Sequence, residues 1–175
     1  DEFTSSFNAP PEHLTIIVAL PRAGSTFLQQ IFISDLEIGY VSNLMAKFWM
    51  APSIGARLQA ELCQPNFVSS FRSEHGNTYG PLEPHEWGWF WKDMLALKGD
   101  EHYNSRPFDA TRLRQKLAAM EYVLGSPLMF DSVYAAANLP RLLEILPELC
   151  VIYLTRDPFF VCNSILNARL RRYGN

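Results

Sequence analysis

The chain has 175 residues, of which 48% are hydrophobic and 19% are charged, and its formal net charge is −3. This length suffices for one globular domain with a buried core, and the composition excludes an extensively disordered protein. The slightly acidic balance gives no general reason to bind nucleic acid, and no apolar run reaches the roughly 18 residues that a membrane span needs.

The first predicted element is a buried strand over residues 14–20, which follows an extended lead-in. Its apolar, β-branched run stops at the small-residue turn of residues 21–26, and a helix is predicted over about residues 25–35. A strand that ends in such a turn and restarts as a helix directs several free backbone N–H groups and the positive helix end at one point. The segment therefore predicts a binding site for a phosphate-like anion.

This turn differs from the phosphate loop of ATP-binding proteins in its cation. When G-x-x-x-x-G-K-[ST] is aligned so that Gly24 is the second glycine, Ala19 replaces the first glycine and Ser25 replaces the lysine. The loop thus lacks the lysine that reaches the β- and γ-phosphates of ATP. Its cation is Arg22, which comes earlier in the turn.

The middle of the chain is predicted to be mostly helical, with one long loop. Residues 64–84 are rich in Ser, Gly, Asn and Pro, and a loop of this length inside a compact domain is usually functional or mobile. We expect the region of about 41–125 to form an inserted helical and aromatic subdomain above the ligand edge of the sheet. Helices are predicted over residues 43–50, 53–62, 85–97 and 109–124, the last capped by Asp109.

The last part of the chain repeats the strand-to-helix pattern. A short strand over 127–130 and a helix over 139–146 precede an apolar strand over 150–154, and a further helix is predicted from Pro158. Asp157 is a good N-cap for that helix, and proline suits the first helical position. Strands that alternate with helices predict an α/β fold with a central, mainly parallel sheet flanked by helices.

Arg156 lies at the carboxyl end of the last predicted strand, where open α/β sheets bind ligands. Ser164 follows it by eight residues, which is about two helical turns. Capping of the helix explains Asp157 and Pro158, but it explains neither Arg156 nor Ser164. The two residues are therefore candidates for a second anion-binding element.

Taken together, the two segments resemble the sulfotransferases that use 3′-phosphoadenosine-5′-phosphosulfate (PAPS). Residues 21–30, PRAGSTFLQQ, are similar to the family's 5′-phosphosulfate loop, P-[KR]-[SAG]-G-[ST]-[ST]-x-L, in the Arg form of tyrosylprotein sulfotransferases and many bacterial members. Residues 154–166, LTRDPFFVCNSIL, are similar to the family's 3′-phosphate element. The resemblance implies a P-loop-like fold and transfer of a sulfuryl group from PAPS to an acceptor hydroxyl or amine. Adenosine 3′,5′-bisphosphate (PAP) would be the product, and no metal would be required.

The resemblance also implies roles for individual residues. Arg22 would offset charge on the bridging oxygen, and Arg156 and Ser164 would bind the 3′-phosphate. The residues expected to surround the 5′-phosphosulfate are Arg22, Ala23, Gly24, Ser25, Thr26 and Phe27. Relatives usually continue beyond the second motif, so residues 1–175 are expected to be a single sulfotransferase-like domain that lacks its C-terminal part.

The general base is sought in the segment that begins at Gly80, because an acceptor hydroxyl must lose a proton to a Glu or His within reach. The segment loosely resembles the E-x-H-F-F stretch of heparan sulfate sulfotransferases, in which the Glu is the base. It makes Glu83 the first candidate, His85 the second and Glu86 the third, with His75 in the preceding loop as a further one. A solvated helix N-terminus is the alternative interpretation of these acids.

Three further features bear on the site. The chain has an odd number of cysteines, and they are scattered: Cys63, Cys150 and Cys162. We therefore expect buried free thiols in a reducing compartment rather than disulfides or a zinc site. With no signal peptide at the start of the chain, a reducing compartment favours a cytoplasmic location.

The aromatic residues of the segment after Glu86 are expected to pack in the core or to line a substrate cleft. They are Trp87, Trp89, Phe90 and Trp91. Relatives often have a lysine at the position of Asp131, so this acid removes one cation from the site.

Two alternatives to a sulfotransferase stay open at this point. One is a kinase with a degenerate phosphate loop, and the other is a sulfotransferase-like module that binds a nucleotide without turnover. The acceptor is equally open: a carbohydrate, a lipid, a small metabolite or a carrier-bound acyl chain would fit. The sequence indicates neither a nucleic-acid partner nor an oligomeric state.

Overall fold

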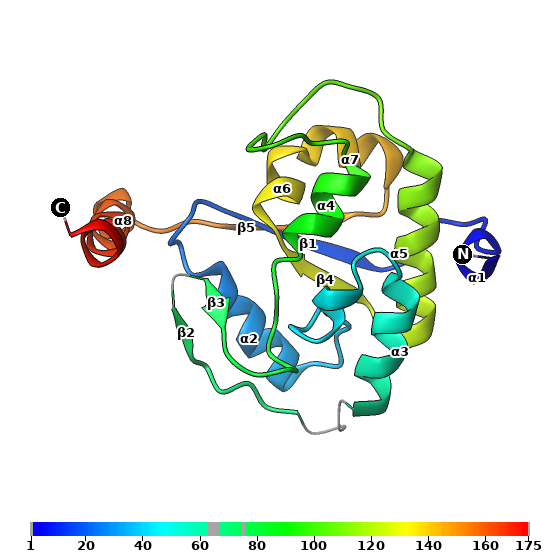
Figure 1. Ribbon diagram of the computed structural model, residues 1–175, viewed down its shortest axis with the longest axis horizontal. Coiled ribbons are helices and arrows are strands. Elements are labelled where there is room, and N and C mark those ends of the chain that lie inside the picture. The colour runs from blue at the N-terminus through cyan, green and yellow to red at the C-terminus, as the bar shows by residue number, and fades with distance from the viewer. Residues whose placement is uncertain (1, 63–66, 75, 175) are drawn as a thin grey trace.

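A three-stranded parallel sheet forms the centre of the molecule (Figure 1). The structure is a computed structural model that describes residues 2–62, 67–74 and 76–174. The strands are β1 (Leu14–Ala19), β4 (Leu128–Asp131) and β5 (Cys150–Leu154), in the order β4-β1-β5. Helices cover the sheet, so the predicted α/β fold with a parallel sheet is confirmed. A separate two-stranded antiparallel sheet pairs β2 (Ser73–Glu74) with β3 (Asn77–Thr78).

Most predicted helices are present, with shifted ends. The helical elements are α1 (Glu2–Ser5), α2 (Ser25–Asp35), the 3-10 helix η1 (Met45–Phe48), α3 (Pro52–Leu62), α4 (Gly88–Met94), α5 (Ala110–Leu124), α6 (Val133–Ala137), α7 (Leu139–Ile145) and α8 (Pro158–Tyr173). The helix predicted from residue 85 begins only at Gly88, because Trp87 has a left-handed backbone and the preceding residues pair with another segment. There, the backbone N–H of His85 donates to the carbonyl of Val41 over 2.8 Å.

Aromatic side chains of α4 pack on the face of the sheet. Trp87 and Phe90 stack with ring centroids 3.9 Å apart, and Trp91 meets Phe130 of β4 edge to face at 5.3 Å. Residues 87, 90, 91 and 94 share one face of the helix, and all are buried. Trp89 points the other way and is 68% exposed. Three of the four predicted aromatic residues therefore belong to the core.

The edge strand β5 and helix α8 are far more exposed than the rest. In Figure 1, α8 lies at the far left, away from the body of the sheet, and Val161 is the one buried residue among those described in α8. Cys150 and Cys162 are exposed free cysteines. The prediction of buried thiols is wrong for these two residues. Among the described residues, Cys150 lies on a strand that pairs with β1 on one side only, and Cys162 lies on the exposed helix α8. Cys63 lies outside the described residues.

None of the helices in the described ranges is both long enough and apolar enough to cross a membrane.

Candidate functional site

The turn between β1 and α2 has the backbone geometry of an anion-binding loop. Arg22 and Gly24 both have positive φ, 69° and 108°. A Cβ at Gly24 would meet no described atom within 4 Å, so it is the left-handed conformation, and not lack of space, that favours glycine there. No side chain in the described part of the chain caps α2. The N–H groups of its first turn are therefore left for a bound ligand.

The structure brings the two predicted anion-binding segments into direct contact. The guanidinium Nε of Arg22 donates to Oγ of Ser164 over 3.0 Å, across 142 positions of sequence. Nη1 of Arg156 donates to the backbone carbonyl of Arg22 over 3.1 Å. Asp157 caps α8 as predicted, since its carboxylate accepts from the N–H of Phe159 over 2.8 Å. The carboxyl ends of β1 and β5 therefore hold both motifs together.

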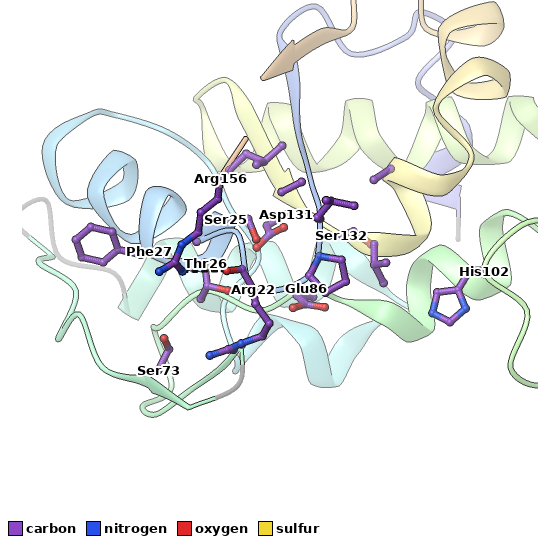
Figure 2. A pocket seen from close by; sticks show the side chains of 18 residues that line it. Arg22, Ser25, Thr26, Phe27, Ser73, Glu86, His102, Asp131, Ser132 and Arg156 are labelled. Carbon is purple, nitrogen blue, oxygen red and sulfur yellow. Dashed lines mark hydrogen bonds between the residues drawn. The ribbon is translucent and has the colours of Figure 1, made fainter. Parts of the chain in front are cut away.

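A cavity of about 370 Å³, called here the loop cavity, opens at this place (Figure 2). Predicted residues that line it are Arg22, Gly24, Ser25, Thr26, Phe27, Glu86 and Arg156. Ala23 is outside the lining, and its N–H donates to the carbonyl of Leu20. Ser164 also lies outside the lining and reaches the site through Arg22. Figure 2 shows both arginines and the two acids Glu86 and Asp131 gathered around the loop.

Asp131 lies at the floor of the loop cavity, at the end of β4. It is 7% exposed, and its Oδ2 has no hydrogen-bond partner within the described part of the chain. Burial raises the pKa of Asp131 to about 6, although hydrogen bonds from the side chains of Ser25 and Thr26 oppose this shift. The acid noted in the sequence in place of a lysine thus lines the same cavity as the loop between β1 and α2.

Glu86 is the candidate base that faces this cavity. Desolvation by the cavity walls, followed by the charge of Asp131, raises the pKa of Glu86 to about 7. A carboxyl group with such a pKa both accepts and releases a proton near neutral pH. The two acids lie in one cavity, so the ionisation of one disfavours the ionisation of the other.

Glu83, the first candidate in the sequence, is placed differently. It is 4% exposed, and it lines neither the loop cavity nor any other described pocket. Its carboxylate accepts hydrogen bonds from the side chains of Gln30 and Ser69 and from the N–H of Ser70. Burial alone would raise the pKa of Glu83, but these hydrogen bonds outweigh it and lower the pKa. Glu83 therefore fastens the segment before β2 to α2.

His85 also lies outside the loop cavity. Its Nδ1 accepts from the N–H of Trp87 over 2.8 Å. Burial lowers the pKa of His85, and the charge of Lys47 lowers it further. The ring is thus mainly neutral near pH 7 and lines a neighbouring cavity. His75 lies outside the described residues.

Replacing Glu83 with glutamine should destabilise the protein, because an amide replaces a carboxylate that accepts three hydrogen bonds. We expect a loss of about 1–3 kcal/mol in the free energy of unfolding at pH 7, measured by urea denaturation. The pKa of Glu83 is lowered by folding, so the difference should shrink as the pH falls below its ordinary value of 4.5. Glu144→Gln, on the exposed face of α7, is the matched control. Unchanged stability with lost activity would instead support Glu83 as the base.

Replacing Asp131 with asparagine should stabilise the protein at high pH. Folding raises the pKa of Asp131 from 3.8 to about 6, so the wild-type protein loses stability as the pH rises through this window. The amide of Asp131→Asn carries no charge to bury, and the gain should reach no more than about 3 kcal/mol at pH 8 and vanish below about pH 4. Urea denaturation at both pH values measures it, with the exposed Asp100→Asn as control. A variant that is less stable at pH 8 would contradict this account.

Comparison with known proteins agrees with this geometry. The sequence model of the sulfotransferase family matches residues 15–173, which include both predicted anion-binding segments and everything between them. No curated relative and no solved structure matches the chain significantly. Within the described ranges, no group of three or more His, Cys, Asp and Glu side chains is placed to hold a metal ion. The match covers far more than half of the sequence, and the chain therefore belongs to the sulfotransferase family.

Proposed function

We propose that the protein transfers a sulfuryl group from PAPS to an acceptor hydroxyl or amine. The observation that carries this proposal is the contact of the two predicted donor-binding segments, through Arg22, Arg156 and Ser164, at one cavity. PAPS has two phosphate groups and a sulfonate. A site for it needs separate anion-binding groups on either side of one cavity, and two distant segments supply them.

The residues present fit this donor. The free N–H groups at the start of α2 and the hydroxyls of Ser25 and Thr26 are suited to the 5′-phosphate. Arg156 and Ser164 are suited to the 3′-phosphate, for which arginine offers a bidentate grip. Arg22 is proposed to stabilise the negative charge that develops on the bridging oxygen, and a donor of this kind commonly contributes about 3–4 kcal/mol to the transition state.

The proposed step is an in-line transfer. The acceptor oxygen forms a bond to sulfur while the bond from sulfur to the bridging oxygen breaks, and the electron pair of that bond stays on the 5′-phosphate of PAP. The proton of the acceptor hydroxyl goes to the carboxylate of Glu86. Glu86 is proposed for this task in place of Glu83 because it lines the loop cavity and has a pKa of about 7.

Different features bear on the kinase and on the binding module without turnover, the two alternatives to a sulfotransferase. A kinase reaction is disfavoured because Ser25 stands where the nucleotide-gripping lysine would be. A binding module without turnover is the second candidate, and it is favoured by Asp131, an acid in the cavity where a cation would help the reaction. Measured turnover of PAPS separates these two functions. The cytoplasmic location inferred from the cysteines remains a prediction.

Arg156→Ala should weaken binding of PAP by about tenfold to a hundredfold, which corresponds to about 1.5–3 kcal/mol for a charge-assisted contact. Ser164→Ala should cost less, because its contact is neutral. Binding of adenosine 5′-phosphate, which has no 3′-phosphate, should scarcely change in either variant. Calorimetry with EDTA present measures all of these affinities, and Arg171→Ala, exposed in the last turn of α8, controls for the lost charge.

Equal losses for PAP and adenosine 5′-phosphate would mean that Arg156 and Ser164 only maintain the fold. Tighter binding of ATP–Mg²⁺ than of PAP would favour the kinase instead.

Glu86→Gln should lower kcat by about a hundredfold or more while leaving the affinity for PAP nearly unchanged, because the proposed task of Glu86 is on the acceptor proton. In the wild-type enzyme the rate should rise with pH through about 7, as Glu86 ionises, and the variant should lose this rise. Transfer of labelled sulfate from PAPS, followed from about pH 5.5 to 8.5, measures both effects. The exposed Glu148→Gln is the control. Full activity of Glu86→Gln together with an inactive His85→Ala would assign the base to His85.

A further inference from the structure

A second cavity, called here the side cavity, adjoins the loop cavity. Its volume is about 720 Å³, and it lies between η1, the β2–β3 hairpin and the start of α4. Gly76 and Glu86 line both cavities. The proposed base therefore faces the side cavity as well as the phosphate-binding loop. A molecule held in the side cavity would present a hydroxyl to Glu86 at the place where the two cavities meet.

The charges around the side cavity are mainly positive. Lys47 and Lys92 line it, and Glu86 is the one acid among its described lining residues. No carboxylate in the described part of the chain forms an ion pair with either lysine, and the nearby Asp93 is paired with Arg112 at 3.1 Å. The pKa of His85 is lowered by burial and by Lys47, so the ring adds little charge. The charges of the two ammonium groups are thus not neutralised by a carboxylate of the described residues and attract an anion, although Lys92 also donates to the carbonyl of Gly99.

Aromatic rings form part of the same wall. Trp89 lines the side cavity and is 68% exposed, although its neighbours on α4 are buried in the core. Nζ of Lys92 lies 5.7 Å from the centroid of the Trp89 ring and 5.1 Å from that of Tyr134. Trp87 also lines the cavity, and its buried Nε1 has no hydrogen-bond partner among the described residues. Flat rings beside the unpartnered Nε1 of Trp87 suit a cyclic ligand with oxygen substituents.

We propose that the side cavity binds the acceptor and that this acceptor is a cyclic molecule with a carboxylate or another anionic group. Lys47 and Lys92 bind the anionic group, Trp89 stacks on the ring, and the reacting hydroxyl reaches Glu86 at the junction of the cavities. This assignment rests on the proposed function and narrows its acceptor. A cationic acceptor would be repelled by the two lysines, and a purely apolar chain would leave both ammonium groups desolvated without a partner.

The test compares two probes that differ in a single group. 4-Nitrophenyl β-D-glucuronide carries a carboxylate where 4-nitrophenyl β-D-glucoside carries a hydroxymethyl group, and their rings are otherwise alike. Calorimetry on the full chain saturated with PAP should give an affinity at least about tenfold higher for the glucuronide, a difference of about 1.4 kcal/mol. Lys47→Gln and Lys92→Gln should each remove most of this preference. Trp89→Ala should weaken the binding of both probes to the same extent.

Lys98→Gln is the matched control, because Lys98 is exposed and lines neither cavity. Lys92 also donates to the carbonyl of Gly99 over 2.7 Å, so a thermal melt should accompany its variant. If that variant is destabilised, Lys47→Gln alone decides the result. Equal affinity for the two probes, no measurable binding of the glucuronide at millimolar concentration, or an equal effect of Lys98→Gln would overturn the proposal.

The same measurements separate failure of this proposal from failure of the proposed function. PAP affinity and transfer of labelled sulfate to the glucoside are measured for every variant. If the two probes bind equally well while PAP binds and sulfate is transferred, only the proposal of an anionic acceptor fails. If PAP itself does not bind, the sulfotransferase function fails, and the comparison of the two probes without PAP still decides the charge preference of the cavity.

Discussion

The parallel pairing of β1 with both of its neighbours is the constraint on which the site depends. Ile17 lies opposite Asp131 of β4, and Ala19 lies opposite Leu154 of β5. Because the three strands run in the same direction, their carboxyl ends meet at one edge of the sheet. The loop after β1, the acid at the end of β4 and the arginine after β5 are therefore brought together by strand register alone. The contact from Arg22 to Ser164 then links α8 to that edge.

Within this arrangement the loop proposed to bind an anion shares its cavity with the buried acid Asp131. The hydroxyls of Ser25 and Thr26 lower the pKa of Asp131 against the effect of burial, and they are also the groups proposed to bind a phosphate. A bound anion would compete for them and would disfavour the ionised form of Asp131, so anion binding and proton uptake at this acid must be linked. The raised pKa values of Asp131 and Glu86 place that linkage close to neutral pH, where a small change in environment alters the charge of the cavity.

The meeting of the two proposed anion-binding segments at one cavity could be predicted from the sequence, and the identity of the acid that faces this cavity could not. Arg22, Gly24 and Arg156 lie next to predicted strand ends, so the local pattern alone fixes their place in a parallel fold. The choice between Glu83 and Glu86 depends on hydrogen bonds from Gln30 and from residues before β2, which are distant in sequence. The exposure of Cys150 was missed for a similar reason. An apolar strand pattern does not tell which strand is the edge of a sheet.

The position of Glu86 between two cavities depends on a residue that has no side chain. Gly76 has a φ of 89°, and a Cβ built there would lie 3.1 Å from Oε1 of Glu86. A larger residue would be strained in that conformation and would press on the carboxylate at the point where the two cavities meet. The hairpin of β2 and β3 therefore does more than close one side of the loop cavity. It brings its backbone close to Glu86, which lines both cavities, so the proposed base lies at the junction of the proposed donor site and the proposed acceptor site.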